Sequence, residues 1–422
     1  MPWRTLTSEQ RRAFVAAYLG WLLDGFDFYM FVFLIPDVQA TFGISSASAG
    51  LIGTATLLAR VVGGIAAGSA ADRWGRKPVL AASIVWYSAF AALGGFAPSY
   101  VALLVLRTTF GLGMGAAWSA GLPLTLEHWP GNLRGVASGL LQGGYSAGVV
   151  LSALIYQGGC AGMDCHAGER WRVFLWIGIA PALVGLWVMS RVTESPLWLA
   201  RKNEAGTHFQ RIGVRQLPVP QGLEMSPGLV FPPGYWRIVA QTFALVGAFQ
   251  MSYQAMSFWY PTMLAKAGRS PLLFVTVVNL AGIIGAALWG RLSETRLGRR
   301  RAVTIAMGIG VLAAPLYAFG TTIATLVIGA LVMGLFAAGS LGVVPGYLAE
   351  RFPTALRGSG MAAAYHSGAA MGALVPYAIP WLQDNGFSLP GAMATFIIAG
   401  GALMIVAIWS GPETRGRDLQ QP

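Results

Sequence analysis

The sequence predicts an all-α polytopic membrane protein with twelve transmembrane helices. Of its 422 residues, 55% are hydrophobic and only 10% are charged, and the mean hydropathy is +0.60. A soluble protein of this size carries roughly 25% charged residues. The second observation is that uncharged runs of the roughly 20 residues needed to cross a bilayer recur along the chain. Together they exclude an ordinary soluble enzyme, a disordered regulator and a fibrous protein.

The uncharged runs divide the chain into two groups of six. They cover residues 13–36, 48–70, 78–97, 101–124, 135–157 and 171–190, then 237–260, 271–290, 302–320, 323–348, 358–381 and 390–410. We therefore predict a six-helix N-terminal half over residues 1–190 and a six-helix C-terminal half over residues 237–422. The connector over residues 191–236 is rich in Pro and is predicted to be a cytoplasmic linker.

The positions of the basic residues predict the orientation. With the N-terminus inside, 22 of the 28 Lys and Arg lie on the cytoplasmic side, four lie outside, and Arg60 and Arg107 lie within spans. Cytoplasmic loops accumulate Lys and Arg, so both termini are expected to be cytoplasmic. The bases are scattered rather than gathered in one tract, so a nucleic-acid partner is not expected.

The two halves contain matching segments at one offset. The segment EHWPGNLRG at Glu127–Gly135 recurs as ERFPTALRG at Glu350–Gly358, and Gly75-Arg76-Lys77 recurs as Gly298-Arg299-Arg300, both shifted by 223 positions. Two halves in the same orientation are typical of parallel-repeat transporters, whose substrate site lies between the halves near the middle of the membrane.

Acids and bases at the cytoplasmic helix ends are predicted to form ion pairs that latch one half to the other in one conformation and release in the next. The alternative is that the bases only anchor the loops to the cytoplasmic side. The latch candidates are Asp72, Arg73, Arg76, Glu127 and Arg134 in the N-terminal half, and Glu294, Arg299, Glu350 and Arg357 in the C-terminal half.

The loop GSAADRWGRK at Gly68–Lys77 resembles the cytoplasmic loop motif of the major facilitator superfamily, and a second copy begins at Gly290. Residues 20–200 more specifically resemble the sialate/lactate-type proton symporters. The matching segments are Asp24–Phe28, Ala59-Arg60, Arg107 with Gly111–Gly115, Trp129-Pro130, Leu133–Gly135, Trp171-Arg172 and Glu194–Pro196. The resemblance implies the major facilitator fold and uptake of organic anions together with protons. The chain departs from that family at Ala117, Gln254 and Phe258, where relatives carry other polar groups.

Formal charges inside the spans are few. They are Asp24, Asp27, Arg60 and Arg107, all in the N-terminal half. Each costs about 2.5–3.5 kcal/mol at a helix centre, so ion pairing or a wet cavity is expected. By span position, Asp24 and Arg60 lie near the midplane, whereas Asp27 and Arg107 lie somewhat outward of it.

We interpret Asp27 as the proton-coupling residue, with Asp24 as the second candidate on the same helix face. Arg60 and Arg107 are predicted to bind the carboxylate of the substrate. The alternative is that the four residues form structural ion pairs.

Several uncharged side chains are predicted to line the substrate cavity. Gln250, Tyr253, Gln254 and Ser257 follow one another at helical spacing and indicate a polar face, which could also serve hydrogen bonding between helices. The other candidates are Tyr29, Trp118, Tyr365 and His366, for which packing is the alternative. A disulfide between Cys160 and Cys165 in the external loop is possible.

The predicted function is proton-coupled symport of a small organic anion, such as a monocarboxylate, a sugar acid or an aromatic acid, by alternating access. The alternatives are a drug/proton antiporter and, more remotely, a membrane-embedded enzyme. Only four His are present and no metal-ligand motif is found, so no enzyme activity, metal or cofactor is expected. The expected partners are the anion, the proton and the lipid bilayer, and the expected form is a functional monomer in the bacterial inner membrane.

Overall fold

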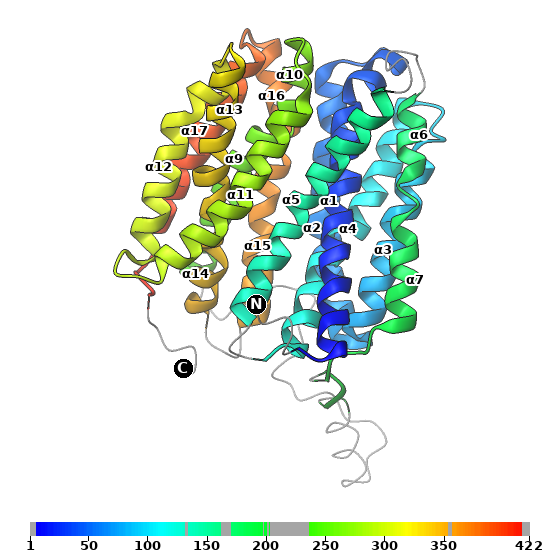
Figure 1. Cartoon of the computed structure of the whole chain (residues 1–422), viewed down its shortest axis with the longest axis vertical. Coiled ribbons are helices and arrows are strands. Elements are labelled where there is room, and N and C mark those ends of the chain that lie inside the picture. The colour runs from blue at the N-terminus through cyan, green and yellow to red at the C-terminus, as the bar shows by residue number, and fades with distance from the viewer. Residues whose placement is uncertain are drawn as a thin grey trace.

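The apolar runs form long helices that lie side by side along one common direction (Figure 1). The computed structural model of the chain describes residues 6–130, 134–161, 170–196, 198–200, 202, 236–352 and 357–415. The predicted linker falls largely outside the described residues, as do Cys165 and the side chain of Cys160.

Seven helices build the six crossings of the N-terminal half. They are α1 (Ser8–Phe42), α2 (Ser46–Trp74), α3 (Arg76–Gly94), α4 (Tyr100–His128), α5 (Arg134–Ala161), α6 (Arg170–Ile177) and α7 (Pro181–Arg191). The helix α1 begins before the predicted span because Thr7 and Gln10 form a capping box that satisfies backbone N–H groups of its first turn.

The C-terminal half repeats this arrangement with more interruptions. Its helices are α9 (Trp236–Ser257), α10 (Tyr260–Lys266), α11 (Pro271–Ser293), α12 (Gly298–Phe319), α13 (Ile323–Val332), α14 (Val344–Arg351), α15 (Arg357–Ala373), α16 (Val375–Asp384) and α17 (Leu389–Trp409). Between α13 and α14 the helix continues as a π turn, Met333–Ala337, and a 3₁₀ turn, Ala338–Gly342.

Twelve crossings result, so the predicted fold class is confirmed. Within the described residues, nine helical segments are long and apolar enough to span a membrane. The other three crossings are α5, the pair α9–α10 and the pair α15–α16. Where the sequence predicts one uninterrupted helix, prolines explain the breaks: Pro181, Pro261 and Pro376 each stand in the first turn of a new segment, because proline lacks the N–H that a continuing helix requires.

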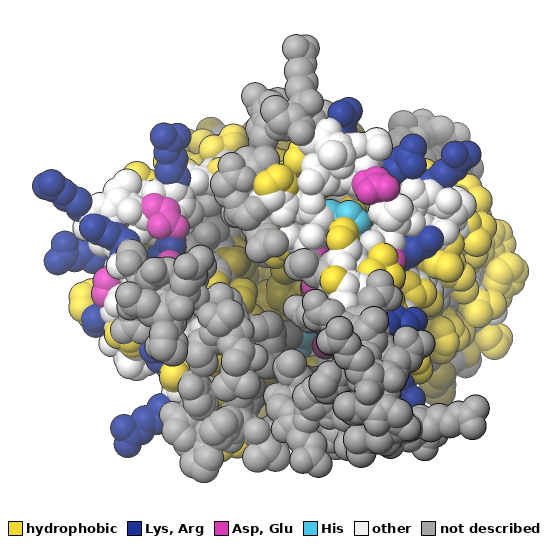
Figure 2. All heavy atoms as spheres, turned by 90° about the horizontal axis from the view of Figure 1, so that it is seen from below, with side chains coloured by type: hydrophobic (Ala, Val, Ile, Leu, Met, Phe, Trp, Pro, Cys, Tyr) yellow, Lys and Arg dark blue, Asp and Glu magenta, His cyan; other side chains and the backbone are white. Residues whose placement is uncertain are grey.

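The two halves stand next to each other, one built from α1–α7 and the other from α9–α17 (Figure 1). They touch where α2 meets α15 and α16, where α5 meets α11, and where α1 meets α10. The start of α1 and the end of α17 lie at the same end of the bundle (Figure 1). We call it the terminal end. Seen from this end, the surface carries many Lys and Arg side chains, and an apolar hollow opens between the halves (Figure 2).

Candidate transport site

An ion pair between α1 and α2 lies near the middle of the membrane crossings. Arg60 Nη2 is 3.4 Å from Asp24 Oδ2, and the Asp24 side chain is fully buried, whereas that of Arg60 is 12% exposed. A buried carboxylate without a partner would be costly, so the two charges stabilise each other. The sequence places both residues near the midplane of the membrane, and in the structure they are in direct contact.

Two aromatic rings lie close to the guanidinium of Arg60. Its central carbon lies 5.0 Å from the ring of Trp21 and 5.7 Å from the ring of Tyr145. Ring faces attract cations, most strongly where water is excluded. Tyr365 and Tyr253 of the C-terminal half lie within electrostatic range of the same guanidinium. Arg60 therefore faces the interface between the halves.

The second acid and the second base are enclosed within the N-terminal half. Asp27 and Arg107 are 2% and 1% exposed. The Arg107 guanidinium carbon lies 4.5 Å from the ring of Phe31 and 5.0 Å from that of Phe110. Arg107 acts on Asp27 electrostatically, but among the described residues no Lys, Arg or His nitrogen lies within 4.0 Å of the Asp27 carboxylate. This pair is remote from the interface, since the Asp27 carboxylate faces Gly178 at the α6–α7 junction.

Towards the terminal end from Arg60, the halves meet through two ring contacts. The rings of Trp118 and Tyr365 stack with centroids 4.4 Å apart and planes within 7° of parallel. His366 Nε2 lies 3.0 Å from Ser119 Oγ, and the ring is packed so closely on Gly64 that an added Cβ there would approach it to 2.3 Å. In this conformation His366 therefore contacts Ser119 and Gly64 across the interface between the halves, and its contact with the substrate stays a prediction.

Towards the opposite end, a second layer of contacts joins the halves. The Tyr377 N–H of α16 donates to Thr54 Oγ1 of α2 at 3.2 Å. Within the C-terminal half, Trp259 Nε1 donates to the adjacent Pro376 carbonyl at 2.9 Å. The Phe28 and Phe258 rings lie 6.1 Å apart. The Asp24–Arg60 pair is therefore located between two layers of contact, as a site accessible from alternating sides requires.

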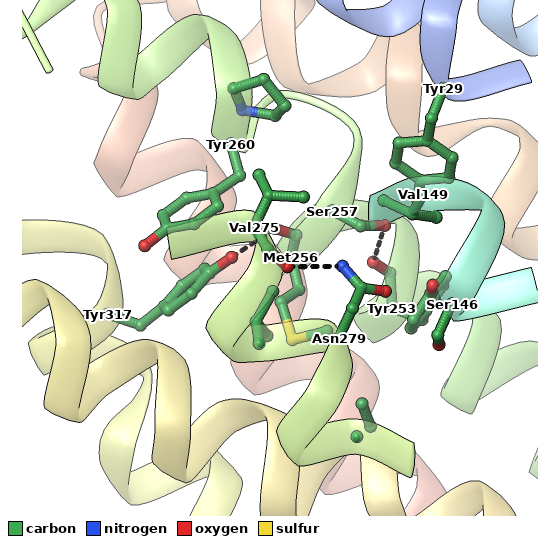
Figure 3. A pocket seen from close by; sticks show the side chains of 14 residues that line it. Tyr29, Ser146, Val149, Tyr253, Met256, Ser257, Tyr260, Val275, Asn279 and Tyr317 are labelled. Carbon is green, nitrogen blue, oxygen red and sulfur yellow. Dashed lines mark hydrogen bonds between the residues drawn. The ribbon is translucent and has the colours of Figure 1, made fainter. Parts of the chain in front are cut away.

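A small cavity lies between the halves and receives side chains from both (Figure 3). We call it the tyrosine cavity. The lining residues from the N-terminal half are Tyr29, Ser146 and Val149, and those from the C-terminal half are Tyr253, Met256, Ser257, Tyr260, Pro261, Val275, Val278, Asn279, Gly282, Tyr317 and Ala338. Tyr29, Tyr253 and Ser257 were predicted to line a cavity. Gln250 and Gln254 were predicted with them but are not among its lining residues.

At the terminal end of the N-terminal half, one arginine joins three helix ends. The Arg76 guanidinium is 2.7 Å from Asp72 Oδ1 and 3.3 Å from Glu127 Oε2, and it donates to the Ala71 carbonyl at 2.7 Å. Glu194, after α7, accepts the backbone N–H groups of Arg76 and Lys77. The hydroxyl of Ser195 donates to Glu127. We call these residues the N-terminal cluster.

The C-terminal half repeats the cluster nearly residue for residue. Arg299 Nη2 is 2.5 Å from Glu294 Oε1 and 2.7 Å from Glu350 Oε1. Glu413, after α17, accepts the N–H groups of Arg299 at 2.9 Å and Arg300 at 3.0 Å, and Thr414 Oγ1 donates to Glu350 at 2.6 Å. We call these residues the C-terminal cluster. The glycines that precede the two arginines, Gly75 and Gly298, both have positive φ, 108° and 79°, which side chains with a Cβ rarely adopt.

The observed ion pairs therefore join helices of the same half. A latch that crosses from one half to the other is not seen among the described residues. Arg73 lies over the ring of Trp74 at 5.9 Å and takes no part in an ion pair of the N-terminal cluster. The side chains of Arg134 and Arg357, also predicted to contribute, lie outside the described residues.

Some residues of these sites were not singled out from the sequence. Tyr145 and Trp21 hold Arg60, and Asn279 is the one amide in the crossing formed by α11. An isolated amide in an otherwise apolar run is a signal that could have identified Asn279. Glu413-Thr414 is also recognisable, because, like the Glu194-Ser195 pair of the family resemblance, it is an acid followed by a hydroxyl just after the last helix of its half.

Comparison with known proteins decides the family. A model described as Major Facilitator Superfamily matches residues 17–376 and 273–422 of the chain. The chain belongs to this superfamily. It is accordingly a multi-pass membrane transporter and not an enzyme.

The relatives in this superfamily include transporters of organic acids. The chain is 33% identical to a probable 4-methylmuconolactone transporter of Cupriavidus pinatubonensis, over 97% of this chain and 92% of that protein. It is 28% identical to the sialic acid transporter NanX of Escherichia coli, over 96% of this chain and 95% of that protein. The fold is that of the proton:xylose symporter XylE, with a TM-score of 0.76, 19% identity and 98% of each chain covered.

Proposed function

We propose that this transporter is a proton-coupled symporter for a small organic anion, such as a monocarboxylate, a sugar acid or an aromatic acid. The observation that carries the proposal is the Asp24–Arg60 pair between the two layers of contact. An arginine exposed to the interface favours an anionic substrate, because its planar guanidinium forms paired hydrogen bonds with a carboxylate. The names of the relatives, which refer to organic acids, support the same class.

The proposed coupling is an exchange of partners at Arg60. In the empty carrier Asp24 is the counter-ion of Arg60. A substrate carboxylate that binds Arg60 displaces Asp24, which then takes up a proton because it has lost its cation in a buried site. Between unit charges about 4 Å apart, a contact is worth on the order of 4 kcal/mol at an effective dielectric of about 20. The coupling is reciprocal, so a bound proton also strengthens anion binding.

The structure favours Asp24 over Asp27 for this exchange, which reverses the preference drawn from the sequence. Arg60 is partly exposed and faces the other half, whereas Arg107 is buried against Phe31 of α1 and Phe110 of α4. A substrate that enters between the halves can reach Arg60 without opening the N-terminal half. In this proposal Asp27 and Arg107 stabilise each other inside that half.

The decisive experiment measures uptake by proteoliposomes that contain the purified protein, with labelled monocarboxylates, sugar acids and aromatic acids. With an acidic exterior, at least one anion should accumulate above its external concentration, and a protonophore should abolish the gradient. Asp24→Asn resembles the protonated form, so it should lose uphill accumulation and retain exchange of internal for external anion. Asp27→Asn is the matched variant and should retain accumulation.

Three outcomes would contradict the proposal. Accumulation that persists with the protonophore excludes proton coupling. Loss of accumulation in Asp27→Asn but not in Asp24→Asn assigns the proton to the enclosed pair. Proton-driven export of cationic drugs, with no anion uptake, identifies a drug/proton antiporter instead.

We further propose that the terminal end faces the cytoplasm of a bacterial cell and that the protein acts as a monomer. The Lys and Arg on that face support the orientation (Figure 2). In a variant without the native cysteines, an impermeant thiol reagent added outside should label a cysteine at position 268, between α10 and α11. It should not label one at position 296, between α11 and α12. Labelling of position 296 alone would invert the topology.

A further inference from the structure

A cationic corner ends the lipid-facing surface of the C-terminal half. The helices α12 and α17 pack against each other at the outer side of this half, and the start of α12 meets the end of α17 at the terminal end (Figure 1). Figure 2 shows Lys and Arg side chains along this edge of the molecule, at the left of that view. These cations follow directly on apolar crossings, so they lie where the hydrocarbon of the bilayer gives way to headgroups.

Both helices carry an exposed apolar stripe that leads to this corner. On α12, Ile305 is 42% exposed and Leu312 is 83% exposed, and both follow the exposed Arg301 at helical spacing on one face. On α17, Val406 and Trp409 are three residues apart and are 64% and 49% exposed. The stripe of α12 therefore ends at a cation, and the stripe of α17 ends at a tryptophan, a residue that favours the membrane interface.

Trp409 orients a second arginine at the same place. The Arg300 guanidinium carbon lies 4.0 Å from the centre of the Trp409 ring, and Arg300 Nη2 donates to the Trp409 carbonyl at 3.3 Å. The indole is fixed in turn, because its Nε1 donates to Thr304 Oγ1 at 2.8 Å. A side chain that is already ordered loses less conformational freedom when it binds a ligand. Arg300 is therefore preorganised next to Arg301.

The acids of the C-terminal cluster do not neutralise these two arginines. Their carboxylates pair with the buried Arg299 or accept backbone N–H groups. Within the part of the chain that the structure describes, neither Arg300 nor Arg301 forms an ion pair. Both cations thus lack a carboxylate partner at the end of an apolar surface.

The matching positions of the N-terminal half show what topology alone requires. At the offset of 223, Arg300 corresponds to Lys77 and Arg301 corresponds to Pro78. One lysine there is sufficient for a positive cytoplasmic end. Two arginines differ from it chemically, because a guanidinium forms paired hydrogen bonds with phosphate oxygens, whereas a lysine is a point charge. The difference between the repeats indicates that the C-terminal corner has a task beyond orientation.

We propose that Arg300, Arg301 and Trp409, which we call the arginine corner, bind the phosphodiester of an anionic phospholipid whose acyl chains lie along the exposed faces of α12 and α17. The proposal does not depend on the transported substrate. Basic residues beside membrane helices attract anionic headgroups. The apolar stripes favour a lipid over a free phosphate, because only a lipid has chains that cover them. Phosphatidylglycerol, which has a phosphodiester and no amine, suits this corner better than a zwitterionic lipid.

Native mass spectrometry of the full chain, purified in detergent, tests the proposal. The protein is titrated with phosphatidylglycerol or with phosphatidylcholine of identical acyl chains, and the apparent dissociation constant of the first bound lipid is measured. Phosphatidylglycerol should bind at least about tenfold more tightly, since each arginine near a membrane surface contributes a factor of about five. Glycerol 1-phosphate, which has the phosphate but no chains, should not displace the lipid at equal concentration.

Single substitutions locate the effect at the corner. Arg301→Gln should raise the dissociation constant for phosphatidylglycerol about fivefold and leave that for phosphatidylcholine within about twofold. Arg301 is exposed, so the variant is expected to fold. Arg296→Gln is the matched control, because Arg296 is an exposed arginine of the same half that lies in the turn before α12 and not on an apolar stripe. It should bind both lipids as the wild type does.

Three results would overturn the inference. The first is equal affinity of the wild type for the two lipids. The second is an equal loss in Arg301→Gln and Arg296→Gln, which would show a diffuse surface charge and not a site. The third is displacement by glycerol 1-phosphate as effective as that by the lipid, which would show a phosphate site independent of acyl chains. Each of these results leaves the proposed symport untouched, because none of them measures transport.

Discussion

The two halves of this transporter are alike at their terminal ends and different inside the membrane. In each half one arginine, Arg76 or Arg299, pairs with an acid at the same repeat position, Glu127 or Glu350. Inside the membrane, the N-terminal half carries Asp24, Asp27, Arg60 and Arg107, whereas the C-terminal half contributes most of the tyrosine cavity and no charge to it. The ion-pair clusters are therefore present in both halves, whereas the charges inside the membrane are found in the N-terminal half among the described residues.

The division suggests separate tasks for the halves. The proposed charge binding and proton exchange both involve residues of the N-terminal half. A substrate that touches both halves favours the conformation in which they close around it, because only differential binding can shift a conformational equilibrium.

Substitution of Arg60 is expected to change anion uptake most. Arg60→Lys keeps the positive charge but loses the planar fork, so we expect the half-saturation concentration for anion uptake to rise about 10- to 100-fold, as the loss of a charge-assisted hydrogen bond implies. Initial uptake rates in proteoliposomes measure it. Arg291→Lys, on an exposed arginine at the end of α11, is the control.

The buried Arg107 is expected to respond differently from Arg60. Because Arg107 faces Phe31 and Phe110 rather than the interface, Arg107→Lys should leave the half-saturation concentration within about threefold while lowering thermal stability. A rise in half-saturation equal to that of Arg60→Lys would show that the substrate reaches the enclosed pair, and would restore the sequence-based preference for Asp27.

The next effect tests whether the two clusters are equivalent. Arg76→Gln and Arg299→Gln each leave buried or half-buried carboxylates without their cation, which costs about 3–5 kcal/mol for a fully buried pair and less here, where Asp72 and Glu294 are exposed. We expect similar decreases in the thermal unfolding midpoint in detergent for the two variants. Arg73→Gln and Arg296→Gln, on exposed neighbours, should change it little.

A clear difference between the unfolding midpoints of the two cluster variants would show that the clusters are not equivalent. If Arg76→Gln alone were destabilising, the C-terminal cluster would be a conformational contact rather than a structural one. Transport rates would then separate the two roles, since a structural pair affects the amount of folded protein and a conformational pair affects the turnover of each molecule.

Much of this architecture could be predicted from the sequence because hydrophobic length and repeat offset are one-dimensional signals. The crossings, the six-plus-six arrangement and the matched Arg76 and Arg299 follow from such signals. The depth of each charge in the membrane also follows from its position within its span, and this position places Asp24 and Arg60 together near the midplane. Which pair faces the interface between the halves does not follow, because it depends on how α2 packs on α4, where Gly63 and Gly111 let the backbones approach closely.

The breaks in the crossings and the tyrosine cavity could not be predicted from the sequence either. Pro261 and Pro376 signal interruptions, but the resulting helix directions depend on contacts such as that between Trp259 and the Pro376 carbonyl. The cavity combines residues from seven separate segments, and Tyr260 and Tyr317 have no shared sequence signal. Aromatic residues are frequent throughout the chain, so the cavity-lining tyrosines could not be told from those that face lipid.

The smallest expected effect concerns the acid that ends the C-terminal cluster. Partial burial acts to raise the pKa of Glu413, but four backbone N–H donors, those of Arg300, Arg299, Arg415 and Thr414, outweigh it and hold this pKa below its usual value of 4.5. A carboxylate whose pKa is lower in the folded state stabilises that state above the unfolded pKa, and the stabilisation is lost as the pH falls through the folded pKa. Glu413→Gln should therefore lower the unfolding midpoint slightly at pH 7, by the equivalent of about 1 kcal/mol or less, as for the loss of a charge at a helix N-terminus. The difference from wild type should shrink as the pH falls below about 4.5, the usual pKa of a glutamate. Asp384→Asn, on an exposed acid at the opposite end of the molecule, is the control for general charge effects. A difference that stays constant from pH 7 to pH 3.5 would mean that Glu413 acts through its shape and not its charge, and the likeness of the two clusters would then rest on Arg76 and Arg299 alone.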